Sequence, residues 1–143
     1  MDGEVILHMY NKFGVERTLQ ELDGVFAVTI LDTKKQQFHL GRDTFGVRPM
    51  FTVRKQTGEL GVCSEAKGLI GLCRTNGVVT KVEPFLPGTF ATFQLDPVTG
   101  RTKLVEEKKF TDVDVPQVIL LTLFFIMHIG YPYRDGFNLR RKE

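Results

Sequence analysis

The chain has 143 residues, a formal net charge of +2 and 25% charged residues. One domain of this length can bury a hydrophobic core, and the basic residues are scattered among acidic ones, so the composition gives no indication of nucleic-acid binding. Cys63 and Cys73 lack the spacing of metal ligands and are interpreted as small apolar residues in a reducing compartment, which favours the cytosol. The scattered histidines, His8, His39 and His128, predict no metal site.

Two helices are predicted at the start of the chain. Residues 2–13 place apolar side chains at helical spacing, with Asp2 as the N-cap and Gly14 as the stop. The residues of this apolar face are Val5, Ile6, Met9, Tyr10 and Phe13. A short second helix is predicted over residues 15–21, with Val15, Leu19 and Leu22 facing inward.

The stretch from 22 to 49 predicts a strand, a tight turn, a return strand and a charged loop. Residues 25–31 are mostly β-branched or apolar and predict a largely buried strand, and residues 38–41 predict its partner. The loop that follows contains Arg42, Asp43, Gly46 and Arg48. It is expected to be ordered by pairing of arginine with carboxylate and by glycine turns.

Beyond the loop, hairpins alternate with a short helix. Strands are predicted near residues 60–63, 78–82, 89–95 and 102–105, with turns at 55–59 and 96–100. A helix is predicted to begin at Ser64, as the N-cap, and to end near residues 73–77. This mixture of hairpins and few helices predicts an α+β fold.

The end of the chain differs from the rest. Residues 118–129 are nearly all apolar, and residues 131–143 are polar and basic. The apolar run is shorter than the ~20 residues that span a bilayer, so no membrane span is predicted. A buried element and an exposed apolar tail both remain open. The predicted division is a domain over residues 1–115 and a divergent tail over 116–143.

Five segments together resemble the glutaminase domain of glutamine-hydrolysing asparagine synthetases. They are residues 2–7, 22–27, 41–49, 63–69 and 82–88. The Arg-Asp…Gly-Val-Arg-Pro loop is also found in other amidotransferases of this type, such as the phosphoribosyl and fructose-6-phosphate types. The Ser-Glu-Ala-Lys and Glu-Pro-Phe-Leu-Pro-Gly segments narrow the resemblance to asparagine synthetases.

The resemblance implies an Ntn-hydrolase-like domain, a four-layer αββα sandwich, here truncated at its N-terminus. The family nucleophile is a cysteine at the mature N-terminus whose own α-amine takes up the proton. This sequence begins Met1-Asp2, and it matches neither the family's oxyanion segment nor its arginine for the glutamine carboxylate. No catalytic residue is therefore predicted. ATP and Mg²⁺ belong to the full-length family, and no cofactor is expected for this chain, which lacks the glycine-rich pyrophosphate loop.

One ligand residue follows from the resemblance. Asp2 matches the aspartate that contacts the α-amino group of glutamine, and its alternative role is that of a helix cap. The other prominent polar residues are interpreted as structural: Arg42, Asp43, Gly46, Arg48, Ser64, Glu65 and Lys67. Glu65 and Lys67 are two residues apart on the predicted helix and are not expected to face each other.

Three functions remain open at this stage. The first is an asparagine synthetase family fragment that is inactive by itself, where the family reaction is glutamine hydrolysis supplying ammonia for ATP-dependent conversion of aspartate to asparagine. The second is a non-catalytic module that pairs through exposed sheet edges with itself or with an intact glutaminase domain, as in full-length asparagine synthetase. The third is a domain of another amidotransferase, against which residues 84–88 argue.

Overall fold

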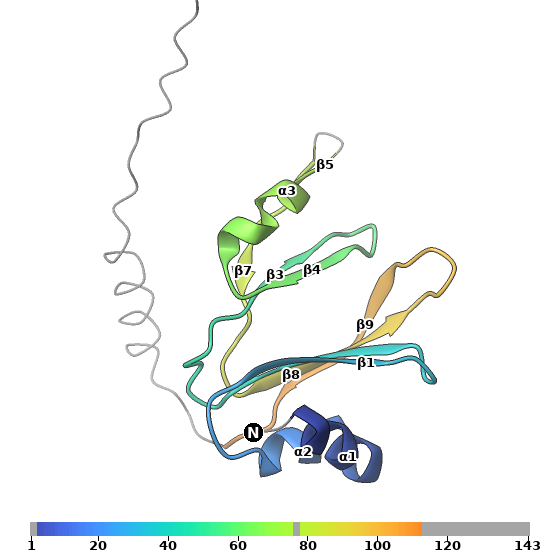
Figure 1. The fold of residues 1–143 in the computed structure, drawn as a ribbon. Helices are drawn as coiled ribbons and strands as arrows, with labels where there is room; N and C mark the ends of the chain where they lie inside the picture. Colours follow the sequence, from blue (N-terminus) through green and yellow to red (C-terminus); the bar gives the residue numbers. More distant parts are fainter. Residues whose placement is uncertain (1–2, 76–77, 113–143) are drawn as a thin grey trace, which may run out of the picture. The chain divides into compact units, whose positions relative to one another are not determined.

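The structure is a computed structural model that describes residues 3–75 and 78–112 (Figure 1). Its elements in chain order are α1 (Gly3–Phe13), α2 (Val15–Glu21), β1 (Ala27–Asp32), β2 (Gln37–Arg42), β3 (Phe51–Arg54), β4 (Leu60–Cys63), the 3₁₀ helix η1 (Ala66–Leu69), α3 (Ile70–Cys73), β5 (Arg74–Thr75), β6 (Val78–Val79), β7 (Glu83–Pro84), β8 (Thr89–Leu95) and β9 (Thr102–Lys109). The described part of the chain is therefore mixed helix and strand, as predicted.

Two antiparallel sheets form the centre of the fold. The first has the strand order β1-β2-β8-β9 and the second β4-β3-β7, and β5 and β6 form a separate two-stranded ribbon. β1 and β2 pair in register from Ala27 with Arg42 to Asp32 with Gln37, so the turn between them is tight. The predicted turn at 96–100 likewise joins β8 to β9, whose pairing starts at Leu95 and Thr102.

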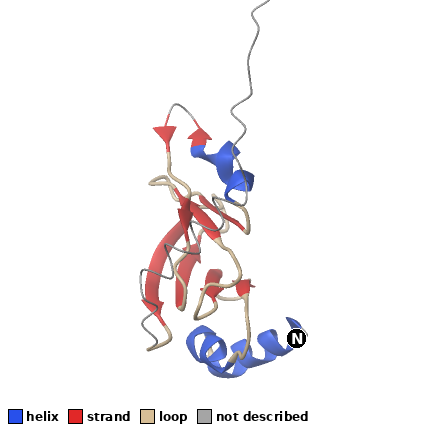
Figure 2. Cartoon of the chain, turned by 90° about the vertical axis from the view of Figure 1, so that its left-hand side faces the viewer, coloured by secondary structure: helices blue, strands red, loops and turns tan. Residues whose placement is uncertain are grey.

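Three hydrophobic clusters separate four layers. Side chains alternate between the two faces of a strand, so one sheet can contribute to two clusters. Leu19, Phe90 and Phe110 join α2 to the four-stranded sheet. The two sheets pack through Leu40, Met50, Phe85, Ala91 and Phe93, and the three-stranded sheet packs on η1 and α3 through Val53, Leu69 and Cys73. The order of the layers is helices, sheet, sheet, helices (Figures 1 and 2).

The prediction of a largely buried first strand is wrong. Within β1 only Ile30 is buried, and Leu31 is 53% exposed. The cause is its position at the edge of the sheet, where β2 covers one side only. The apolar face predicted for α1 is also buried only in part, because Tyr10 is its one buried residue while Val5 and Phe13 are exposed.

Two further boundaries differ from the prediction. Ser64 is not a helix N-cap, because η1 begins at Ala66 and the preceding Glu65 has extended backbone and makes no side-chain cap bond. The strand predicted over residues 78–82 is limited to Val78–Val79. By contrast, the helix over 15–21 and the strand over 89–95 lie where the sequence predicted them.

Some predictions fall outside the described residues. They concern Asp2, His128 and the tail over 116–143. The domain boundary at residue 115 therefore stays a prediction. Across residues 3–75 and 78–112, no helix combines the length and apolar character needed to cross a bilayer.

Candidate functional site

Asp43 is the centre of the loop that follows β2. Its side chain is 1% exposed, and its carboxylate accepts hydrogen bonds from the main-chain N–H groups of Phe45 at 3.2 Å, Val47 at 3.0 Å and Arg48 at 3.1 Å. A buried carboxylate requires such donors, because the hydration that it loses on folding must be replaced. The side chain therefore fixes the path of the loop.

The main chain of Asp43 forms three hydrogen bonds, one within the loop and two to other segments. Its N–H donates to the carbonyl of Phe26 at 2.9 Å, and its carbonyl accepts from Gly46 at 3.0 Å and from Gly88 at 2.9 Å. Gly88 in turn accepts a hydrogen bond from the N–H of Phe110 at 2.9 Å. Asp43 thus links the entry to β1, the loop and the entry to β8, and Gly88 extends this chain of hydrogen bonds to the exit from β9.

Arg42 holds the same loop from its other side. Its guanidinium donates to the carbonyls of Arg48 at 2.8 Å, Phe85 at 2.5 Å and Gly46 at 2.6 Å. Burial lowers the pKa of the Arg42 guanidinium, and the neighbouring charge of Asp43 acts in the opposite direction. The predicted pairing of arginine with carboxylate is therefore wrong: Arg42 binds carbonyls, the carboxylate of Asp43 binds amides, and Arg48 contributes its main-chain groups. In a tight loop these backbone groups have no ladder partner, so side chains satisfy them.

Gly46 permits the close approach of the Pro84–Gly88 segment. Its φ is +66°, and a Cβ placed on it would lie 2.7 Å from Cγ of Pro87 and 3.0 Å from Cζ of Arg42. The hydrogen bond from Arg42 to the carbonyl of Phe85 therefore joins two segments that resemble family motifs and lie 43 residues apart. We name the assembly of residues 42–48 and 85–88 the interlocked loop.

Glu65 and Lys67 contact each other, contrary to prediction. Nζ of Lys67 lies 2.6 Å from Oε2 of Glu65. The helical spacing rule does not apply, because Glu65 precedes η1 with φ −128° and ψ 131°. The two side chains are 78% and 59% exposed, so this ion pair contributes little to stability.

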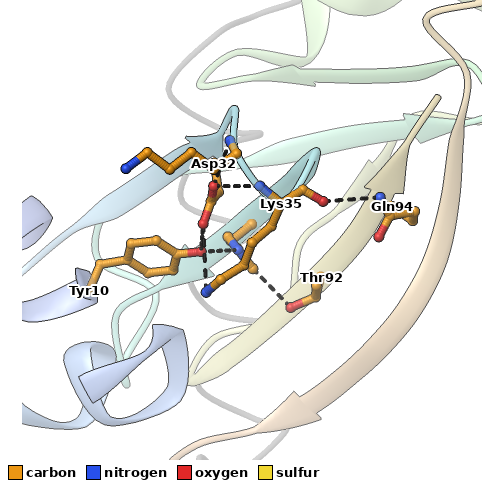
Figure 3. Close-up of polar contacts among 7 residues, drawn as sticks. Tyr10, Asp32, Lys35, Thr92 and Gln94 are labelled. Atoms are coloured by element: carbon orange, nitrogen blue, oxygen red, sulfur yellow. Dashed lines mark hydrogen bonds and ion pairs between the residues drawn. The ribbon is translucent and has the colours of Figure 1, made fainter. Parts of the chain in front are cut away.

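A second polar cluster was not found by the sequence reasoning. We call it the Tyr10 network (Figure 3). The Tyr10 hydroxyl donates to Oδ2 of Asp32 at 2.7 Å and lies 3.0 Å from Nε2 of His39, whose Nδ1 lies 3.0 Å from Oγ1 of Thr92. The residues come from α1, β1, β2 and β8. No two of these four residues belong to one local motif. Their spacing in the sequence therefore does not predict that they form a cluster.

The hydrogen bonds of the Tyr10 network fix the role of one ring nitrogen of His39. Since Tyr10 donates to Asp32, its oxygen accepts from Nε2–H of His39, while Nδ1 pairs with the hydroxyl of Thr92. Burial lowers the pKa of His39, and it raises the pKa of Tyr10 together with the hydrogen bond to Asp32. The pKa of Asp32 falls to about 2, first through the Lys35 main-chain N–H and then through the Tyr10 hydroxyl. His39, whose two ring nitrogens both form hydrogen bonds, joins α1 to the four-stranded sheet through Tyr10 and Thr92.

The two thiols have structural surroundings. Cys73 is buried and donates to the carbonyl of Leu69 at 3.2 Å. Cys63 is partly exposed, and its sulfur lies 2.7 Å from where a Cβ on Gly68 would stand. Among the residues that the structure describes, no three His, Cys, Asp or Glu side chains gather where they could hold a metal ion.

Hollows lined by described residues open on the surface of the fold. One has a volume of about 570 Å³ and is bordered by the cations Arg54, Lys55, Lys81 and Arg101. Two of these cations already pair with carboxylates, Arg54 with Glu107 and Lys55 with Glu59. Another hollow, of about 390 Å³, lies between β1 and β4, and none of the described residues that line it is charged.

The interlocked loop and the two antiparallel sheets are compatible with the protein family that comparison with known sequences identifies. A family model described as a glutamine amidotransferase domain matches residues 1–101, a range that contains the whole interlocked loop, and the chain belongs to this family. Its relatives include the glutamine-hydrolysing asparagine synthetases of Gallus gallus, 54% identical over 110 residues, Homo sapiens, 50% over 117, and Mus musculus, 50% over 110. The resemblance inferred from the motifs is thereby confirmed.

The alignments cover 77%, 81% and 77% of this chain and 19%, 21% and 19% of the respective relatives. The chain thus spans about a fifth of the length of the curated relatives that it matches.

Proposed function

We propose that the chain provides part of the glutaminase scaffold of an asparagine-synthetase-type protein, with an Ntn-hydrolase-like arrangement of layers. The observation that carries the proposal is the 50–54% identity to glutamine-hydrolysing asparagine synthetases. The helix–sheet–sheet–helix order of the clusters is compatible with it. The whole protein would release ammonia from glutamine and use it for ATP-dependent conversion of aspartate to asparagine.

Within this scaffold the interlocked loop has a positioning role rather than a chemical one. The functional groups of Arg42 and Asp43 are engaged by main-chain carbonyls and amides. Each of the three guanidinium nitrogens of Arg42 donates to a main-chain carbonyl, and both carboxylate oxygens of Asp43 accept from main-chain amides, which supports a structural role for both side chains. The loop would instead hold the ends of β2, β8 and β9 in fixed relation. Binding of the glutamine α-amino group by Asp2 is a further part of the proposal.

We propose also that the 143-residue polypeptide does not hydrolyse glutamine by itself. Amide hydrolysis by a thiolate requires a base beside the sulfur and donors for the developing oxyanion, which together contribute several orders of magnitude in rate. In the described part of the chain no hydrogen bond joins either thiol to an imidazole, and His39 uses both nitrogens for Tyr10 and Thr92.

The test is an ammonia assay on the purified chain. Wild type, Cys63→Ala and Cys73→Ala are incubated with glutamine, and full-length asparagine synthetase from Gallus gallus serves as the positive control. We expect equal background ammonia from all three variants, and no asparagine on addition of ATP, Mg²⁺ and aspartate. Ammonia release by the wild type that Cys63→Ala abolishes would overturn the proposed inactivity.

A second function is favoured by the free sides of the two sheets. β1 and β4 each have one hydrogen-bonded neighbour among the described strands, and both border the same uncharged hollow. A non-catalytic module that pairs with an intact glutamine amidotransferase domain fits this arrangement. Analytical ultracentrifugation of the chain with the Gallus gallus enzyme tests it: a complex supports pairing, and independent sedimentation at concentrations of tens of micromolar refutes it.

A further inference from the structure

The attachment of α1 to the four-stranded sheet depends on Tyr10. Tyr10 is the one buried residue of α1, whereas Val5, Leu7 and Phe13 of the same helix are exposed. Among the described residues, no other side chain of α1 forms a hydrogen bond or an ion pair with the sheet. α2, by contrast, packs on the sheet through the buried Leu19. The two helices are therefore held in different ways.

The Tyr10 hydroxyl reaches the sheet through the buried imidazole of His39 (Figure 3). Nε2 of His39 lies 3.0 Å from this hydroxyl, which itself donates to Asp32, so Nε2 carries a hydrogen. When the imidazole is neutral, Nδ1 has a lone pair and accepts from the hydroxyl of Thr92, 3.0 Å away. In this state every polar side-chain group of the Tyr10 network has a partner.

A proton added to Nδ1 of His39 removes that match. Nδ1 becomes a donor, so Oγ1 of Thr92 must accept, and the hydrogen of the Thr92 hydroxyl then needs another acceptor. Across residues 3–75 and 78–112, Oγ1 of Thr92 has no hydrogen-bond partner other than Nδ1, and the residue is buried. A buried hydroxyl that lacks an acceptor destabilises the arrangement that buries it. Protonation of His39 therefore disfavours the docked position of α1.

The charges around His39 act in both directions. Burial lowers the pKa of His39, the carboxylate of Asp32 raises it, and the ammonium of Lys35 lowers it. Nζ of Lys35 lies 3.6 Å from Oδ2 of Asp32 and 5.2 Å from the centre of the Tyr10 ring, so a cation already adjoins the network. Other charged or titratable groups of α1, α2 and β9 are exposed or paired with one another, among them Glu4, His8, Lys12, Glu16, Glu106 and Lys108.

We propose that the Tyr10 network is an acid-sensitive switch, in which protonation of His39 at Nδ1 releases α1 from the four-stranded sheet while α2 and the sheet stay folded. Release of α1 admits water to the imidazolium and to the Thr92 hydroxyl. Because the released state takes up the proton more readily than the docked state, release becomes more favourable as the pH falls below about 6.5. α2 keeps its own contacts, which include the bond from Nε2 of Gln20 to the carbonyl of Phe110 at 3.2 Å.

Hydrogen exchange measured by mass spectrometry tests the proposal on the full 143-residue chain. Exchange is followed at pH 7.5 and pH 5.0 in α1 and in β8, and the rates are corrected for the change of intrinsic exchange with pH. We expect the opening equilibrium of α1 to rise at least about fivefold at pH 5.0, since each unit of pKa difference contributes a factor of up to about ten. That of β8 should change less than about twofold.

Two histidine variants assign the effect to one imidazole. His39→Gln removes the titrating group of the Tyr10 network, and we expect the opening of α1 to become independent of pH within about twofold. His8→Gln is the matched control, because His8 belongs to α1 itself and is exposed, and it should keep the full increase. Circular dichroism verifies that both variants are folded.

A measurement on the wild type decides the matter if His39→Gln does not fold. In a pH titration followed by NMR, the imidazole signals of His39 and the amide signals of α1 should change over the same pH range, and those of β8 should not. The proposal is overturned by α1 opening that is independent of pH, by an equal increase in α1 and β8, by an increase that persists in His39→Gln or is lost in His8→Gln, or by α1 signals that do not follow His39.

Discussion

Replacing Asp43 by alanine should be among the most damaging single changes in the loop. The substitution removes a carboxylate that is 1% exposed and accepts three main-chain hydrogen bonds. Hydrogen bonds to charged groups contribute about 1.5–3 kcal/mol each, but the three donors are only partly buried and regain some hydration. We therefore expect a loss of about 3–4 kcal/mol, a large fraction of the ~5–15 kcal/mol that stabilises a typical domain.

Urea denaturation followed by circular dichroism measures this loss. Asp96→Ala is the matched control, because Asp96 accepts N–H groups of Val98 and Thr99 in a similar manner but at the solvent-exposed turn between β8 and β9. Its replacement should cost much less than that of Asp43, because water can take over the hydrogen bonds of an exposed turn. Equal losses for the two variants, or a loss below about 1 kcal/mol for Asp43→Ala, would show that burial does not make the Asp43 bonds important.

Three other perturbations have defined outcomes. Arg42→Lys should lower the free energy of unfolding by about 1–3 kcal/mol in urea titration, because a lysine cannot hold three carbonyls with a planar fork, and an unchanged midpoint would refute this. Gly46→Ala should reduce the melting temperature more than Gly100→Ala: the two φ angles are +66° and +68°, but a Cβ meets other atoms only at Gly46. The depressed pKa of His39 means that the unfolded chain binds the extra proton first, so stability should fall as pH decreases below about 6.5, and His39→Gln should flatten this dependence in thermal melts between pH 7 and 5.

Local features of the fold were predictable because their causes are local. The turn residues Asp96–Gly100 and the alternation over 89–95 define a hairpin within a short window. The helix at 15–21 likewise follows from the spacing of Val15, Leu19 and Leu22, which pack in one cluster. Such elements require no knowledge of the rest of the chain.

The burial of β1 was not predictable in the same way. Its composition is that of an inner strand, but β8 pairs with β2 and leaves β1 at the edge. Which strands become neighbours depends on pairings between distant residues, such as Phe38 with Phe93. Propensity at residues 25–31 contains no information on that choice.

The candidate site shows the same limit for side chains. The charged residues of the loop were identified, but their partners are main-chain groups, including the carbonyl of Phe85, 43 residues beyond Arg42. The sequence shows which carboxylates could pair with an arginine. It does not show which main-chain carbonyls lack a hydrogen-bond donor in the folded chain. His39 was dismissed as a scattered histidine because Tyr10 and Thr92 lie 29 and 53 residues away.

The link from Asp43 through Gly88 to Phe110 has a consequence for the order of events during synthesis. The loop after β2 leaves the ribosome long before residues 85–110 that complete its hydrogen bonds. Because contacts distant in sequence form only after the intervening chain is available, the loop should become ordered late, together with the pairing of β8 and β9. Once formed, this region should open as one cooperative unit, so that the amide protons of Val47, Arg48 and Gly88 exchange with solvent at similar free energies of opening.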